Sequence, residues 1–186
     1  MKLKAFKRNV EKKCSVKKLR REGKIPAVIY KKGSSGEELS IDGQMFTAAL
    51  RKVEPGHLST TVFILEEEGR AERQVIVKEI QYNVTNYDVI HLDFEELIEG
   101  TPVNVKIPIE IVGAADCPGI KLGGVPRQVI RAMKVRCLPK DIPASFPVDI
   151  STLSLGESKR LSDLQIANTI RPLMNLSEVA VAIVKR

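Results

Sequence analysis

The sequence has 186 residues, of which 43% are hydrophobic and 28% are charged, and its formal net charge is +7. This composition is typical of a globular protein, so a disordered chain is not expected. No apolar run approaches the 18 residues that a membrane span needs, so no membrane span is predicted and no membrane partner is expected. The excess of basic over acidic residues favours an anionic partner.

The N-terminal residues and the cysteines indicate in which cellular compartment the protein is expected. The N-terminal segment is charged and has no apolar stretch, so it is not expected to be a secretory signal. Cys14, Cys117 and Cys137 are odd in number and widely spaced, without any Cys-x-x-Cys pair. Neither a disulfide framework nor a zinc site is expected. We therefore expect a cytoplasmic protein that holds no metal.

The positive charge is concentrated at one end of the chain. Residues 1–32 contain thirteen Lys or Arg and two acids, a net charge of +11, whereas residues 33–186 carry −4. Leu19, Ile25, Val28 and Ile29 are interleaved with the basic residues, which indicates a folded segment with a fixed positive surface. The alternative is a solvated, lysine-rich face or tail.

The first predicted elements are a helix, a turn and a strand. Ser15 is a candidate N-cap, and Gly23 occupies the position of a helix C-cap, so a helix is predicted over Ser15–Glu22. Pro26 prevents the helix from continuing and favours an extended segment over residues 27–30. Residues 31–36 have turn composition. A second short helix is predicted over residues 44–53, with Asp42 as its cap.

Strand patterns dominate the rest of the N-terminal half, at residues 60–65, 73–80 and 89–94. The last of these alternates, and side chains of a strand point to opposite faces in turn. Ile90, Leu92 and Phe94 are predicted to face the core. The opposite face then carries Val89, His91 and Asp93.

An acidic segment ending in Gly100-Thr101-Pro102 is the best candidate for a linker. Beyond it, β-branched runs at residues 103–112, 125–137, 146–150 and 179–184 predict a second block of strands, interrupted by a helical patch near residues 161–167. Residues 119–124, GIKLGG, are interpreted as a turn. The fold class is therefore mainly β, with domains at residues 1–95 and 96–186.

Catalytic motifs are absent from the sequence. There are two histidines, and His57 is expected to be solvated in a loop. No Gly-x-Ser-x-Gly elbow, Walker loop or His-Glu-x-x-His motif occurs. We expect no enzyme, no cofactor and no small-molecule substrate.

Nucleic-acid binding is better supported, although not by base stacking, since only 4% of the residues are aromatic and none is Trp. The basic helix would lie beside a strand face that carries His91 and Asp93. Phosphates repel a carboxylate, so Asp93 on a binding face needs a base amino group or a basic neighbour. The alternative is that Asp93 pairs with an arginine and that His91 is an ordinary surface residue.

Several segments, taken in order, carry a family resemblance: KKLRREGKIPAVIY (17–30), VKEIQ (77–81), HLDF (91–94), GGV (123–125), CLPKDIP (137–143) and VDIS (148–151). Together they resemble the long, two-domain form of the bacterial large-subunit ribosomal protein L-twenty-five/CTC family. The resemblance implies an N-terminal β-barrel with short helices that binds 5S rRNA. The positions that it implies for RNA contact are Arg8, Lys18, Arg20, Tyr30, Gln81, His91 and Asp93.

The sequence departs from the family at two places. Lys31 and Lys32 follow Tyr30 where many relatives have Gly, which would add a phosphate contact. Tyr82-Asn83-Val84 stands where relatives often have His-Pro, so a contact made by that histidine is not expected here.

The function expected from these observations is that of a structural protein of the large ribosomal subunit, bound to 5S rRNA through residues 1–95. The alternative is a stress-induced accessory factor that binds 5S rRNA conditionally, and an RNA-modifying enzyme lacks the motifs it would need. Since residues 33–186 are net negative, no basic surface is expected on the C-terminal domain, and a protein contact or a more distant ribosomal contact is the expectation for it.

Overall fold

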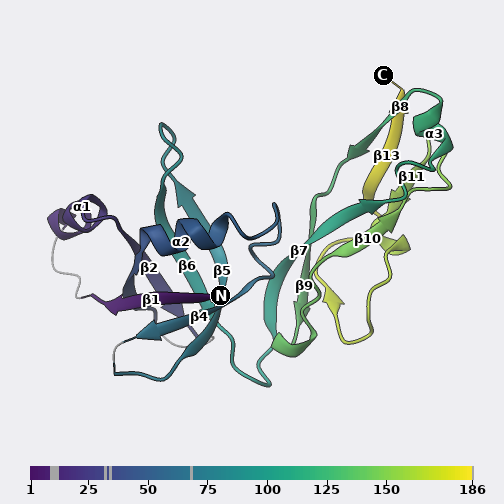
Figure 1. Ribbon diagram of the computed structural model, residues 1–186. Coiled ribbons are helices and arrows are strands. Elements are labelled where there is room, and N and C mark those ends of the chain that lie inside the picture. The colour runs from purple at the N-terminus through teal and green to yellow at the C-terminus, as the bar shows by residue number, and fades with distance from the viewer. Residues whose placement is uncertain (9–12, 32, 34, 68, 186) are drawn as a thin grey trace. The chain divides into compact units, whose positions relative to one another are not determined.

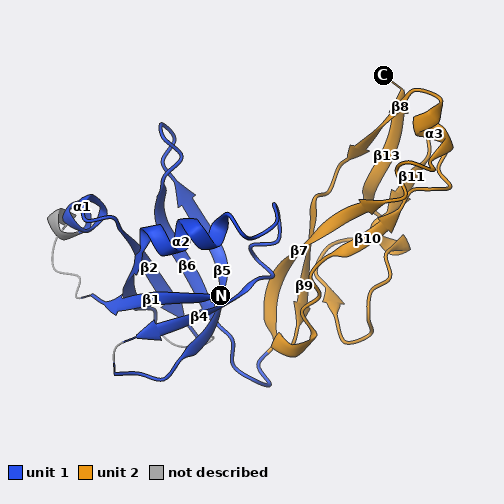
Figure 2. Cartoon of the chain, in the orientation of Figure 1, with its two compact units in different colours: residues 1–101 blue, residues 102–186 orange. Residues whose placement is uncertain are grey.

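The computed structural model describes residues 1–8, 13–31, 33, 35–67 and 69–185 (Figure 1). The chain divides into two compact units, residues 1–101 and 102–186 (Figure 2). We call them the N-terminal unit and the C-terminal unit. Both consist mainly of strands, which confirms the predicted fold class.

The N-terminal unit is a closed six-stranded barrel in the order β1-β3-β2-β6-β5-β4. Two of its pairings, β1 with β4 and β2 with β6, are parallel, and the others are antiparallel. One side chain in two along each strand faces the barrel interior, as the period of a strand requires. The strands are β1 (Lys2–Lys7), β2 (Lys24–Tyr30), β3 (Glu37–Asp42), β4 (Val62–Glu67), β5 (Arg73–Tyr82) and β6 (Val89–Glu96).

Two helices accompany the barrel, α1 (Lys13–Arg21) and α2 (Gly43–Leu50). The described part of α1 includes Ser15 within the helix, so the predicted N-cap at Ser15 is wrong. Gly23 follows its end with φ +77°, a left-handed conformation that glycine adopts without strain. The predicted cap of α2 is confirmed, because the Asp42 carboxylate accepts bonds from the N–H groups of Gln44 and Met45.

The alternation predicted for β6 fails at its first two residues. Leu92 and Phe94 are fully buried as expected, but Val89 packs against the barrel core and Ile90 does not. The cause is a bulge: Gln81 pairs with His91 and Tyr82 pairs with Val89, so Ile90 has no partner in the ladder. The faces of Val89 and Ile90 are therefore exchanged relative to the prediction.

Charged side chains form a network around the β4–β5 hairpin. Arg73, whose side chain is 12% exposed, contacts Glu67, whose side chain is 5% exposed. Arg73 also lies 3.1 Å from Glu37, which Arg70 approaches at 2.8 Å. The hydrogen bond from Arg70, the largest influence, lowers the pKa of Glu37 below its ordinary value. The network satisfies a buried carboxylate that would otherwise destabilise the barrel.

The C-terminal unit contains two sheets, a four-stranded one in the order β10-β7-β9-β12 and a three-stranded one in the order β11-β13-β8. The β-branched run predicted over residues 125–137 contributes to two strands that belong to different sheets and are separated by Val129–Arg131. The elements are β7 (Val103–Val112), α3 (Pro118–Lys121), β8 (Gly124–Gln128), β9 (Ala132–Cys137), β10 (Phe146–Asp149), β11 (Ser158–Arg160), β12 (Arg171–Pro172) and β13 (Val179–Lys185).

Three smaller expectations are corrected. The helical patch near residues 161–167 is a single 3-10 turn, Leu161–Asp163, and the GIKLGG segment overlaps the short helix α3. His57 is not solvated, since its side chain is 15% exposed and its Nε2 lies 3.8 Å from the Glu54 carboxylate. Cys117 and Cys137 are free and buried. None of the helices described is long and apolar enough to span a bilayer.

Candidate nucleic-acid interface

The outer surface of strands β2, β6 and β5 brings together four of the residues implied by the resemblance. Gln81 of β5 lies directly opposite His91 of β6 in the antiparallel ladder. Asp93 is paired with Val28, and Tyr30 is two residues further along β2 on the same face. We call this surface, defined by Tyr30, Gln81, His91 and Asp93, the outer face.

Arg8 reaches the same surface by way of β3. One row of cross-strand neighbours runs around the barrel from Glu38 through Val28 and Asp93 to Glu79. At the end of this row the Arg8 guanidinium lies 3.3 Å from the Glu38 carboxylate, and the Arg8 N–H donates to the carbonyl of Glu38. The Arg8 side chain is only 14% exposed, so this pair holds it at the edge of the outer face.

His91 and Asp93 form a pair within the outer face. The Nδ1 atom of His91 lies 2.7 Å from Oδ1 of Asp93, and the two side chains are 22% and 32% exposed. Asp93 thus pairs with a histidine, where the alternative in the sequence analysis had it pair with an arginine. The remaining ring nitrogen, Nε2, is the one with which His91 can contact RNA.

Tyr30 is a half-buried hydroxyl donor on this face. Burial is the main cause that raises the pKa of Tyr30 to about 12, and the carboxylates of Glu95, Asp93 and Glu79 add to it. The phenol therefore keeps its proton throughout the neutral range and can donate a hydrogen bond to a base or a phosphate.

The outer face and its neighbours Glu79 and Glu95 are acidic as a whole, a property that the sequence pattern does not predict. Glu79 lies directly opposite Asp93, and Glu95 is paired with Lys78 at 2.6 Å. A bulge at Lys78 shifts the alternation of β5, so the position of Glu79 could not be assigned from sequence spacing. Such a face cannot bind phosphates by charge alone. Its carboxylates are suited to accept bonds from base amino groups.

Helix α1 supplies the positive charge beside this face. Lys17, Lys18 and Arg21 are exposed, whereas Val16 and Leu19 are partly covered. Among the residues that the structure describes, no carboxylate pairs with Lys17, Lys18 or Arg21, so these cations are available to phosphates.

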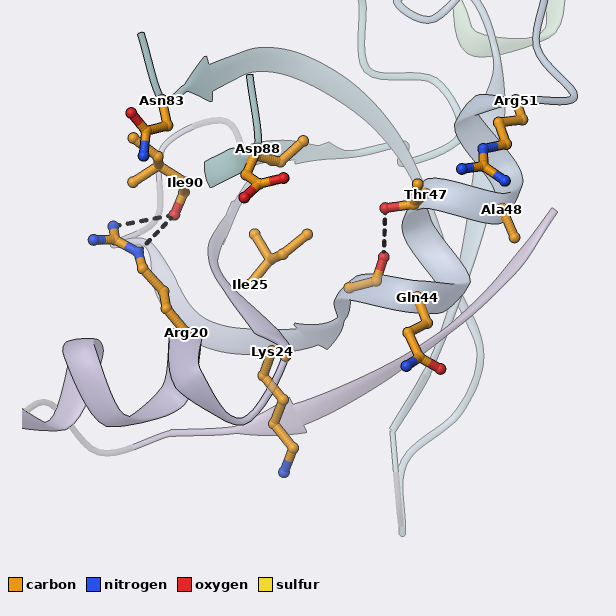
Figure 3. Close-up of a pocket in the computed structure, with 13 residues that line it drawn as sticks. Arg20, Lys24, Ile25, Gln44, Thr47, Ala48, Arg51, Asn83, Asp88 and Ile90 are labelled. Carbon is orange, nitrogen blue, oxygen red and sulfur yellow. Dashed lines mark hydrogen bonds between the residues drawn. The ribbon is translucent and has the colours of Figure 1, made fainter. Parts of the chain in front are cut away.

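Arg20 differs from the other cations of α1 because it is bound to the barrel. Its Nε and Nη2 atoms donate to the carbonyl oxygen of Ile90 at 3.3 and 3.1 Å (Figure 3). Ile90 is the bulged residue of β6, so the bulge provides the acceptor that fixes α1 against β6. Arg20 therefore positions the helix.

The same contact forms one wall of a pocket of about 580 Å³ beside α2. Arg20 and Arg51 lie on opposite sides of the pocket, and Asn83 and Asp88 lie above Ile25 (Figure 3). Asn83 belongs to the segment that departs from the family pattern. The pocket is open to solvent and has both signs of charge.

Of the two lysines that follow Tyr30, Lys31 pairs with Glu96 at 3.3 Å. This pair reduces the charge that Lys31 offers to a phosphate. Lys32 lies outside the described residues.

Comparison with known proteins covers both units. Residues 3–94 match the model of the Ribosomal L25p family, and residues 102–186 match that of the C-terminal domain of ribosomal protein TL5. The large ribosomal subunit protein bL25 of Chlamydia abortus is 48% identical over 186 residues, 100% of each chain. The bL25 proteins of Chlamydia trachomatis serovar D (48% over 179 residues, 96% of each chain) and Chlamydia pneumoniae (46% over 186 residues, 100% of each) are similar to the same extent.

Proposed function

The chain belongs to the Ribosomal L25p family, and on this premise we propose that it is a structural protein of the large ribosomal subunit whose N-terminal unit binds 5S rRNA. Its family is one of ribosomal proteins, so it acts by binding and not as an enzyme. The ribosome is accordingly the site where it works.

The observation that carries the proposal is the convergence of the implied residues on one side of the barrel. Gln81, His91, Asp93 and Tyr30 come from three strands and share the outer face. These residues lie up to 63 positions apart in the sequence. Polar side chains placed at random would be found on all six strands and at both ends of the barrel, so their grouping on three neighbouring strands favours a common function.

The charges suggest a division of labour between α1 and the outer face. The exposed cations of α1 would bind phosphates and supply most of the affinity, which depends on salt. The outer face offers an imidazole, a phenol, an amide and carboxylates, groups that read the edges of bases. Specificity for an irregular RNA helix would then come from the outer face.

The test is a pair of titrations with the whole protein at one salt concentration, one with 5S rRNA transcribed in vitro and one with a transfer RNA. We expect tighter binding to 5S rRNA by roughly a thousandfold or more, the lower end of the usual range for specific over non-specific sites. Equal affinity for the two RNAs would refute the proposal.

The control is a variant with Gln81→Ala and His91→Ala. It keeps every cation of α1, so it should bind the transfer RNA as the parent does while it loses affinity for 5S rRNA. A loss that is equal for both RNAs would assign these two residues to non-specific binding.

A further inference from the structure

The C-terminal unit is the more basic of the two units, contrary to the expectation from the sequence. Residues 102–186 contain twelve Lys or Arg and seven Asp or Glu, a net charge of +5. Residues 1–101 have eighteen and sixteen, a net charge of only +2, because fourteen acids follow the basic segment. The expectation was based on the net charge of residues 33–186. That range includes the fourteen acids of residues 33–101, which belong to the N-terminal unit.

Part of this charge is arranged in order on one sheet. Lys134 and Arg136 lie two residues apart on β9, and Arg171 of the edge strand β12 is directly opposite Arg136. All three side chains are exposed, while Met133 and Val135, which alternate with them, are fully buried. We call Lys134, Arg136 and Arg171 the basic strip.

The basic strip has a cost in the free protein. Like charges directly opposite one another on adjacent strands destabilise a sheet. Arg136 faces Arg171 in this way, and Lys134 faces Lys106 of β7. In the part of the chain that the structure describes, no carboxylate pairs with the three cations of the strip.

The acids of the same sheet lie at its other end. Glu110 is four residues beyond Lys106 on β7, a separation of about 13 Å at the rise of an extended strand. Its carboxylate accepts a bond from the hydroxyl of Ser145, at the strand β10 side of the sheet. The exposed face is therefore polarised, with uncompensated positive charge along β9 and β12.

From this arrangement we infer that the basic strip is a second RNA-binding surface, one that binds the phosphates of duplex RNA and is independent of the outer face. The backbone positions that carry these cations are about 6.7 Å apart along β9 and about 4.8 Å apart between strands, a regular spacing. A sugar–phosphate backbone presents charges at regular intervals, and two of the three cations are arginines, which can bind phosphate through two parallel bonds. An acidic protein is the other polyanion to test, since Leu138 and Leu173 are exposed in the same unit.

The experiment follows each unit separately in the whole protein. A ¹⁵N-labelled sample is titrated with a short RNA duplex of arbitrary sequence, and amide shifts report binding site by site. Amides of β9 and β12 should shift. Their apparent affinity should fall roughly fortyfold between 50 and 200 mM salt, if three phosphates are contacted at a slope of about −0.9 each.

The strip variant carries Lys134→Gln, Arg136→Gln and Arg171→Gln. The matched control carries Lys121→Gln, Arg127→Gln and Lys185→Gln, which removes the same charge from α3, β8 and β13. The affinity read from the amide shifts of β9 and β12 should fall more than tenfold in the strip variant and should be unchanged in the control. The melting temperature of the strip variant should equal or exceed that of the parent, since the like-charge contacts are gone.

Three results would overturn the inference. The amides of β9 and β12 fail to shift with duplex RNA, or both variants lose binding equally, or poly-glutamate of equal total charge shifts the strip as strongly as RNA does. The last result would assign the surface to an acidic protein. None of these results bears on 5S rRNA binding, which is read from the amides of the N-terminal unit.

Discussion

At the scale of single residues, Asp93 is the residue that would distinguish base reading from binding by charge alone. A carboxylate in an interface for phosphates is unfavourable unless it accepts a specific bond. The Nδ1 atom of His91 lies 2.7 Å from Oδ1 of Asp93, which leaves the second carboxylate oxygen to accept a bond. The neighbouring Glu79 is exposed and has no such partner among the described residues.

We predict that Asp93→Asn weakens binding to 5S rRNA by roughly 1–3 kcal/mol, because a base amino group loses its charged acceptor. Binding to an unrelated RNA duplex should be unchanged or slightly tighter. The control is Glu79→Gln, which removes the same charge from the same face and should slightly tighten both complexes. If the two variants behave alike in titrations at fixed salt, Asp93 reads nothing.

Tyr30 gives a prediction about pH. The folded protein raises the pKa of its phenol from about 10 to about 12, so the folded state holds this proton more tightly than the unfolded state. The resulting stability is complete below pH 10 and is lost as the pH rises from 10 to 12. Denaturant unfolding at pH 9 and pH 11 should show a smaller decline for Tyr30→Phe than for the parent. Equal declines would contradict the raised pKa.

At the scale of elements, α1 should act through its charge and its attachment. Replacing Lys18 by Ala should flatten the dependence of log affinity on log salt by roughly one unit, and the preference for 5S rRNA should remain. Lys52→Ala, an exposed cation after α2, should leave the slope unchanged. An unaltered slope for Lys18→Ala would mean that this side chain stays in solvent.

The β4–β5 hairpin should depend on its buried charges. Arg73→Met leaves the Glu67 carboxylate, 5% exposed, without its nearest partner and should cost about 3–5 kcal/mol of unfolding free energy. Arg70→Met, at a side chain that is 42% exposed, should cost less than about 1 kcal/mol. Denaturant melts of the two variants decide the point, and equal losses would show that burial does not matter here.

The sequence predicts the elements that have a single clear period and misses those that do not. Strand β7 was predicted with its observed bounds, and the Asp42 cap and the Gly23 stop were found, because each depends on local chemistry. Strands β1 and β3 are not predicted. In β1, apolar residues alternate with lysines, and this pattern is also typical of a basic tail. The bulges at Lys78 and Ile90 depend on pairing between strands, which no local pattern reveals.

The members of the outer face were identified by family resemblance and not by physical reasoning. Alternation placed His91 and Asp93 together, but it could not bring Tyr30 or Gln81 to them. Tyr30 requires the parallel pairing of β2 with β6, and Gln81 requires the antiparallel pairing of β5 with β6. The pairing of Arg8 with Glu38 and the acidity of the face likewise follow from barrel closure.

At the scale of the whole molecule, the two units should separate by function. A fragment of residues 1–101 contains the complete barrel, α1 and the outer face, so we predict that it folds and binds 5S rRNA nearly as well as the whole chain. Electrophoretic mobility shifts with equal salt would measure this. Comparable affinity for 5S rRNA in a fragment of residues 102–186 would contradict the assignment.

The parallel pairings of the barrel also govern the order of events during synthesis. Lys2 pairs with Ile64 and Ala27 pairs with Leu92, so the parallel partners of β1 and β2 lie more than sixty residues further along the chain. At roughly 5–20 residues per second, translation delays each closure by about 3–13 seconds. Contacts so distant in sequence also slow folding itself. The nascent chain should thus display its most basic segment for seconds before the outer face is assembled.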